Sequence, residues 1–74
     1  MIKKEMYKQG QNNMTVLDIK GDYALICKMK CNKSIVHEYV IAYGCEVDKN
    51  NNIEWCSGKY YFEFDNAIQN WLNI

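Results

Sequence analysis

This chain of 74 residues contains neither proline nor arginine, and it has one histidine and four glycines. Its nine lysines balance nine acidic residues, so no net charge attracts nucleic acid or an anionic membrane surface. No stretch approaches the ~20 apolar residues that a membrane-spanning helix needs, so we expect no membrane association. The same charge balance does little to keep copies of the chain apart, which makes a homodimer a second expectation.

The residues that are abundant indicate one small globular domain. Apolar residues make up 49% of the chain, too many for a disordered segment. A domain of this size buries only about 60% of its unfolded surface, and such a core stabilises it by roughly 3–5 kcal/mol. Lysine, asparagine, isoleucine and tyrosine are common and have A/T-rich codons, which indicates a low-GC bacterium or its phage as the source.

The first residues carry the charges of a signal peptide but not its apolar core. Polar residues 11–13 interrupt the segment, so we expect a cytoplasmic protein, in the producing bacterium or in a phage host. Residues 1–13 are predicted to be a polar tail or an added edge strand. Residues 14–74 are predicted to form a single α+β domain.

Alternating apolar and polar residues predict about four strands. The first two, residues 14–20 and 23–31, flank a Gly-Asp turn signal and read as a tight hairpin. In the first of them, Leu17 and Ile19 are expected to share one face. A short polar turn at residues 32–34 ends this part of the chain.

The remaining two strands form the longest predicted hairpin. Residues 35–47 are apolar on both faces near their middle, which indicates a central strand. A polar loop at residues 48–52 joins them to a final strand at residues 53–62. Gly58, inside that strand, predicts a bulge or the close approach of another element.

Residues 64–72 carry the strongest local signal, that of an amphipathic helix. Its apolar stripe has helical spacing and consists of Phe64, Ala67, Ile68, Trp71 and Leu72. Asp65 or Glu63 is expected to cap the first turn. So short a helix is marginal alone and must dock on the sheet, near the small residues Ala42, Gly44 or Gly58. The predicted fold is therefore α+β, an antiparallel meander of about four strands with one C-terminal helix packed on one face.

Four cysteines, Cys27, Cys31, Cys45 and Cys56, raise the question of a metal or redox site. On a strand Cys27 and Cys31 lie ~13 Å apart, too far to share a metal unless the strand bends. Pairing around the polar loop is expected to bring Cys45 close to Cys56. Without a secretory signal we expect free, buried thiols and no metal or cofactor, and we keep the four cysteines as alternative zinc ligands.

Catalytic and nucleic-acid signals are both weak. His37 has no serine or aspartate partner at a recognisable spacing, and the glutamates form no paired set, so we expect no enzyme. Lys20, Lys28, Lys30 and Lys33 cluster around the second strand and, with tyrosines, suit single-stranded nucleic acid. The missing arginine and net charge weigh against that partner, which stays the alternative.

Large aromatic residues lie on both faces of the last hairpin, whereas one helix covers only one face. Tyrosine and tryptophan often anchor protein interfaces. We therefore expect a protein partner on a surface formed by Tyr43, Glu46, Trp55 and Tyr60, with Glu46 near Trp55 in the hairpin register. The alternative is that the N-terminal segment folds over the second face.

The same half of the chain carries a resemblance. The run Tyr39-Val40-Ile41-Ala42-Tyr43-Gly44, a polar turn, then Trp55-Cys56-Ser57-Gly58-Lys59-Tyr60-Tyr61-Phe62 and a helix with Ala67-Ile68 resembles short uncharacterised proteins of Firmicutes and their phages. Those proteins combine a YVVAW-type strand, a W-x-x-G-x-Y-F strand and a helix soon after. Here Tyr43 stands where tryptophan is frequent, and the link into the helix is shorter. The resemblance covers residues 39–72 and implies a hairpin-plus-helix fold with no known activity.

These observations predict a non-enzymatic protein-binding module. Its small size and codon bias favour a phage or mobile-element inhibitor of a host defence protein, similar in role to anti-CRISPR proteins. A small nucleic-acid-binding regulator that uses the lysines and aromatics of the sheet is the alternative. A zinc- or redox-linked cysteine domain is the third hypothesis.

Overall fold

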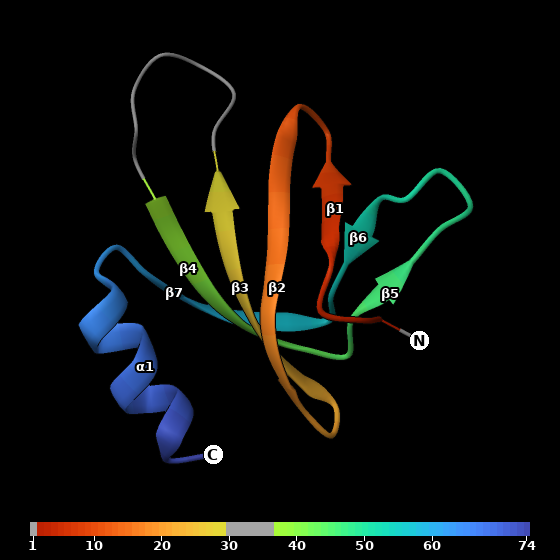
Figure 1. Cartoon of the computed structure of the whole chain (residues 1–74). Helices are drawn as coiled ribbons and strands as arrows, with labels where there is room; N and C mark the ends of the chain where they lie inside the picture. The colour runs from red at the N-terminus through yellow and green to blue at the C-terminus, as the bar shows by residue number, and fades with distance from the viewer. Residues whose placement is uncertain (1, 30–36) are drawn as a thin grey trace.

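The computed structural model describes residues 2–29 and 37–74, which form a five-stranded antiparallel sheet, a two-stranded arm and a helix (Figure 1). The elements in chain order are β1 (Met6–Gln9), β2 (Asn12–Lys20), β3 (Tyr23–Met29), β4 (His37–Tyr43), β5 (Glu46–Val47), β6 (Ile53–Glu54), β7 (Ser57–Tyr61) and α1 (Phe64–Leu72). The predicted α+β class, with a C-terminal helix packed on an antiparallel sheet, is confirmed.

The strand order is β1-β2-β3-β4-β7, and every neighbouring pair is antiparallel. The sheet has one strand more than expected because the N-terminal segment supplies β1, the edge-strand alternative for residues 1–13. β4 lies between β3 and β7, which confirms the central strand. The predicted turn at residues 32–34, and the parts of the two flanking strands placed within residues 30–36, lie outside the described residues.

A break at Gly44 divides the predicted strand 35–47 into β4 and β5. Gly44 has φ +70°, a left-handed conformation that side chains disfavour, and a Cβ there would lie 3.0 Å from the Cys56 Sγ. The predicted strand 53–62 is interrupted at the matching place, so that β6 ends at Glu54 and β7 begins at Ser57. Neither break is visible in the sequence, because the alternation of side chains that predicts each strand continues through it.

The breaks turn the arm, residues 46–54, back towards β1 (Figure 1). The Lys8 backbone N–H donates to the Asn51 carbonyl at 2.9 Å, and the Gln9 side-chain amide donates to the Ile53 carbonyl at 3.2 Å. The predicted polar loop, residues 48–52, forms the tip of the arm. The Asp48 carboxylate closes it by accepting from the backbone N–H groups of residues 50 and 52, both at 2.9 Å.

A bulge in β2 changes which side chains face the helix. Val16 pairs with Ile26, but Asp18 pairs with Leu25, so one extra residue lies between them. Ile19 then packs on the side of Val16, whereas Leu17 is exposed. The expectation that Leu17 and Ile19 share a face is therefore wrong.

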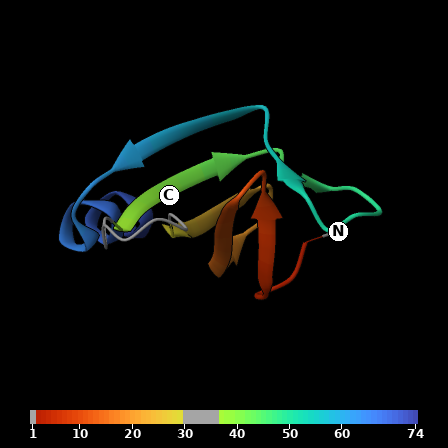
Figure 2. The same ribbon diagram turned by 90° about the horizontal axis from the view of Figure 1, so that it is seen from above.

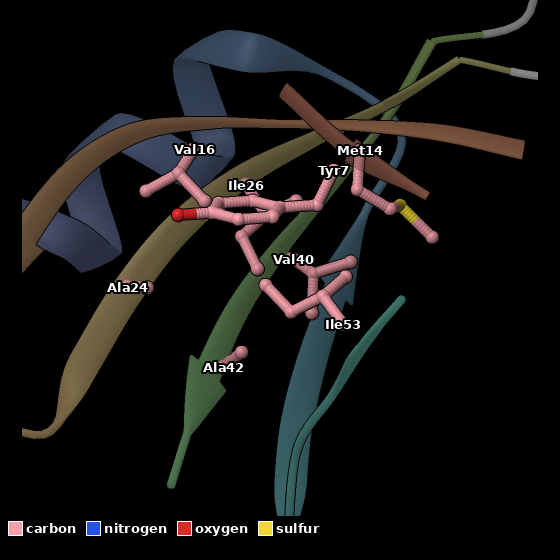
Figure 3. Packing of buried hydrophobic residues seen from close by; sticks show 8 residues of the cluster. All are labelled: Tyr7, Met14, Val16, Ala24, Ile26, Val40, Ala42 and Ile53. Atoms are coloured by element: carbon pink, nitrogen blue, oxygen red, sulfur yellow. The ribbon is translucent and has the colours of Figure 1, made fainter. Parts of the chain in front are cut away.

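Two separate hydrophobic clusters lie on the two faces of the sheet. The first, between the sheet and the arm, consists of Tyr7, Met14, Val16, Ala24, Ile26, Val40, Ala42 and Ile53 (Figure 3). The second, beneath the helix, consists of Leu25, Ile41, Ala67 and Trp71. The face opposite the helix is thus covered by β1 and the arm together.

The helix occupies the predicted residues and is fastened through Trp71, whose side chain is only 1% exposed. The Trp71 indole N–H donates to the Asp18 carboxylate at 3.1 Å. The Lys20 ammonium donates to the Trp71 carbonyl at 2.7 Å and lies 5.0 Å from the centre of its ring. A cation at a helix C-terminus also suits the helix dipole.

Three details of the helix differ from expectation. Leu72, predicted in the buried stripe, is 69% exposed, and Phe64 is 45% exposed. The helix packs on Leu25 and Ile41 rather than on small residues, because Ala42 belongs to the opposite cluster. Glu63 occupies the N-cap position without a side-chain capping hydrogen bond, whereas Asp65 lies in the first turn as predicted. Within residues 2–29 and 37–74, no helix combines the length and apolar content needed to cross a membrane.

Candidate functional site

An open groove of about 730 Å³ lies beside the C-terminal end of the helix. It forms on the helix-facing side of the sheet, where β3, β4 and β7 extend past the part that α1 covers. Tyr23, Tyr43 and Tyr61 supply its aromatic surface, and Asn70 and Asn73 line it from the helix side. The shape and the tyrosines suit a flexible or extended ligand better than an enclosed small molecule.

Two of the tyrosines form a paired aromatic surface in the groove. Tyr23 and Tyr43 are direct partners in the β3–β4 register, and their rings meet edge to face with centroids 5.0 Å apart. The pair lies at the end of β4, where Gly44 ends the strand and donates its N–H to the Asp22 carbonyl at 3.0 Å. Tyr43 is 42% exposed, so much of its ring is open to a ligand.

Lys59 has the single charged side chain among the described residues that line the groove. It lies in the middle of β7 and pairs with Ile41 of β4, so it belongs to the helix-facing side. The groove therefore combines aromatic and amide surface with one positive charge.

The groove borders an unpaired strand edge. Figure 2 shows β7 as the outermost strand, with β4 beside it. Among the described residues no strand pairs with the outer edge of β7, whereas the opposite edge, β1, bridges to Asn52 of the arm. An unpaired edge presents backbone donors and acceptors to any extended chain that approaches it.

The reverse face of β7 carries a second aromatic pair. The Trp55 indole N–H donates to the Tyr60 hydroxyl at 3.2 Å. Trp55 lies directly over Gly58, where an added Cβ would be 3.0 Å from the indole nitrogen and 3.1 Å from a Val40 methyl. The prediction that Gly58 marks the close approach of another element is confirmed, and the element is the Trp55 ring.

The four residues predicted as a partner surface occupy three different places. Tyr43 lines the groove, and Tyr60, 54% exposed, lies on the reverse face of the same edge strand. Trp55 is half-buried against the first cluster. Glu46 lies on the arm, where the register places it opposite Glu54, the residue directly before Trp55.

Both described members of the predicted lysine cluster already make contacts within the chain. Lys20 is held at Trp71, and Lys28 lies 3.7 Å from the Glu38 carboxylate across the β3–β4 pair. Lys30 and Lys33 lie outside the described residues. The alternative nucleic-acid surface therefore offers little unpaired positive charge on β2 and β3.

Cys45 and Cys56 lie close enough to interact electrostatically, so their predicted proximity is confirmed. Cys27 lies on β3 opposite Tyr39, whereas Cys45 packs against the first cluster, and Cys31 lies outside the described residues. Gly44 also lies beside Cys56, because a Cβ on Gly44 would be 3.0 Å from the Cys56 Sγ, and Cys56 is exposed rather than buried. Within the described chain no three histidine, cysteine or acidic side chains are grouped to hold a metal ion.

The thiol environments favour the protonated form. Burial raises the pKa of the Cys27 thiol, and burial followed by the neighbouring Cys56 raises that of Cys45. Burial, with Cys27 as a smaller cause, also raises the pKa of the Tyr39 hydroxyl. A protonated thiol is a weak nucleophile and must lose its proton before it binds a metal.

Sequence reasoning missed several residues of the groove, above all Tyr23, Lys59 and Tyr61. The signal available in the sequence was the alternation of side chains along each strand, which places all three on the face that carries Leu25 and Ile41. This alternation identifies the groove residues only if it is also known that the helix does not cover the ends of the strands. The spacing of residues along one strand does not contain that information.

Comparison of the chain with known protein families, with curated proteins and with solved structures finds no significant match. The fold and the groove together define an α+β domain that presents an open aromatic groove beside an unpaired edge strand.

Proposed function

We propose that this chain is a non-enzymatic protein-binding module that takes up an extended segment of its partner along β7. The observation that carries the proposal is the groove with its three tyrosines directly beside the unpaired edge of that strand. Strand addition derives affinity from backbone hydrogen bonds, while pockets for alternate side chains supply specificity. The groove offers such positions on the helix-facing side of β7.

The surroundings of β7 support this mode of binding. The strand is five residues long, which matches an ordinary strand pair, and the two faces carry different aromatic surface. Tyr61 lines the groove on one face, and Tyr60 lies on the other. An added strand would therefore contact tyrosine on both sides, and tyrosine combines large contact area with a polar tip.

The narrower role of phage or mobile-element inhibitor of a host defence protein is a form of this proposal and rests on chain size and codon bias. The nucleic-acid regulator is disfavoured by the contacts of Lys20 and Lys28 within the chain. The zinc-linked alternative gains no support, because the described residues contain no group of three possible metal ligands, and the redox-linked alternative rests on the single neighbouring pair Cys45 and Cys56.

The test is affinity capture with the tagged full chain from lysate of its source or host, before and after nuclease treatment. Three proteins are compared: the wild type, Tyr43→Ala in the groove, and Glu46→Ala on the arm. We expect a stoichiometric protein partner that survives nuclease, binds the wild type and Glu46→Ala, and is lost with Tyr43→Ala. Thermal melting of each variant shows that it is folded.

Two results would contradict the proposal. Loss of the partner with Glu46→Ala but not with Tyr43→Ala would move the binding surface to the arm. Captured material that disappears after nuclease treatment would favour the nucleic-acid-binding hypothesis. A steep decrease of the binding affinity with added salt would support that hypothesis further.

A further inference from the structure

We infer that the segment taken up along β7 comes from a different protein and carries an aspartate or glutamate opposite Lys59. This inference rests on the proposed function, because it names the chemistry of the partner at the same groove. The argument depends on where Lys59 lies in the strand, on what surrounds it, and on what a second copy of the chain would place there.

Lys59 occupies the position where an added strand would contact a side chain of β7 most directly. It is the middle residue of β7, it is exposed, and its side belongs to the groove. Side chains directly opposite each other on neighbouring antiparallel strands have Cβ atoms about 4.5–5.5 Å apart, within reach of an ion pair. No acidic side chain lines the groove, and no ion pair of Lys59 is found among the described residues.

The neighbours of Lys59 on the same face differ from it in chemistry. Two residues away on either side lie Ser57 and Tyr61, and the adjacent strand contributes Ile41 and Tyr43. An incoming strand therefore contacts uncharged side chains on both sides of Lys59. The complementary segment has an acidic side chain flanked, at alternating positions, by apolar or aromatic side chains.

A second copy of the chain is a poor occupant of this edge. In the antiparallel two-fold register that pairs all five residues of β7 with their copies, Ser57 lies opposite Tyr61 and Lys59 lies opposite itself. Like charges directly opposite each other destabilise a strand pair. A lysine in the middle of an edge strand is a common device against self-pairing, and the same lysine attracts an acidic partner.

The experiment selects a displayed library of random segments of about eight residues, long enough to pair along β7, on three immobilised full-length proteins. These are the wild type, Lys59→Gln and Lys59→Glu, each shown to be folded by its thermal melt. We expect an acidic residue to be enriched at one position with the wild type, to lose enrichment with Lys59→Gln, and to be replaced by a basic residue with Lys59→Glu. A selected peptide with its acidic residue changed to the amide should bind the wild type up to about fivefold more weakly, the upper end of the range for a cross-strand charge pair.

Different failures identify different errors. Peptides that bind through the groove, as shown by their loss with Tyr43→Ala, but carry no acidic enrichment would overturn the inference and leave the proposed function standing. Peptides indifferent to Tyr43→Ala, or no enriched peptide at all, would overturn the proposed function. A wild-type chain that sediments as a dimer, and becomes monomeric in the edge-strand variant Tyr60→Pro, would show that the occupant is a second copy.

Discussion

Trp71 is the residue on which the helix depends most, because its side chain is buried and it also makes two hydrogen bonds with residues of β2. Asp18 accepts a hydrogen bond from its indole, and Lys20 donates to its carbonyl. Both strand residues face the helix only because the bulge after Val16 shifts the alternation of β2. A single extra residue in the strand therefore decides how the helix is held.

The Asp18 contact predicts a specific response to acid. The hydrogen bond from Trp71, then that from the Ile19 backbone and the charge of Lys4, lower the pKa of the Asp18 carboxyl below its ordinary value of 3.8. Because the folded state holds this proton less well than the unfolded state, the stabilisation is present above that ordinary value. It is lost as the pH falls through the lower, folded-state pKa.

We expect Asp18→Asn to remove this part of the pH dependence, since the amide oxygen still accepts from Trp71 but does not titrate. The free energy of unfolding, measured by urea titration from about pH 6 to about pH 3, should fall less steeply for the variant than for the wild type. Asp22→Asn, away from Trp71, is the control. Equal slopes for the wild type and Asp18→Asn would show that the carboxylate does not stabilise the folded state in this way.

At the residue scale, sequence patterns predicted the role of a single residue better than they predicted which residues lie opposite each other on neighbouring strands. The prediction that Gly58 permits a close approach is confirmed, because a Cβ there would lie only 3.0 Å from the indole nitrogen of Trp55. The pairing of the last hairpin was predicted one residue out of register, since Glu46 lies opposite Glu54, although the predicted proximity of Cys45 and Cys56 is confirmed. Counting outward from a loop does not reveal the register of the strands. A shift of one residue is enough to change every facing pair.

The helix, as an element, is short and depends on docking. Replacing Trp71 by alanine should cost about 3–5 kcal/mol, comparable to the whole stability expected for a core of this size. We expect Trp71→Ala to be largely unfolded at room temperature by circular dichroism. Leu72→Ala, on the exposed side of the same turn, should stay within about 0.5 kcal/mol of the wild type. A folded Trp71→Ala variant with a near-native melting temperature would refute this account of docking.

The arm, in contrast, contains an unfavourable pair of charges. Glu46 and Glu54 are direct partners in the β5–β6 pair, and both are exposed. We expect Glu54→Lys to raise the free energy of unfolding by about 0.2–1 kcal/mol, because it replaces repulsion across the strands with attraction. Glu54→Gln should give a smaller gain, and added salt should narrow the differences. If Glu54→Lys is less stable than Glu54→Gln in a denaturant titration, the pair does not interact as its register indicates.

Elements defined by local signals were predicted well. The helix from Phe64 to Leu72 and the polar loop at residues 48–52 have the expected bounds, because each depends on spacing or turn chemistry within a few residues. The arm was not predicted, because its cause is one left-handed glycine in an otherwise regular alternation. Gly44 looks the same in the sequence whether it continues a strand or ends it.

For the molecule as a whole, the decisive feature is a sheet with a hydrophobic cluster on each face. The sequence indicated it through strands that are apolar on both sides, but it did not indicate that the arm and β1 cover one cluster. The candidate groove depends on the same assembly. It combines three strands with the end of the helix, so Tyr43 alone among the residues predicted for the partner surface lies in it.

The alternation of β3 and β4 between the two clusters has a consequence for motion. Leu25 and Ile41 pack beneath the helix, whereas their neighbours Ile26 and Val40 pack beneath the arm. A slip of this strand pair by one residue would empty both clusters at once. We therefore expect the backbone amides of β3 and β4 to exchange with deuterated solvent only through global unfolding, while those of the arm and of β7 exchange through local opening. Protection of the arm equal to that of β4 would mean that the two faces open as one unit.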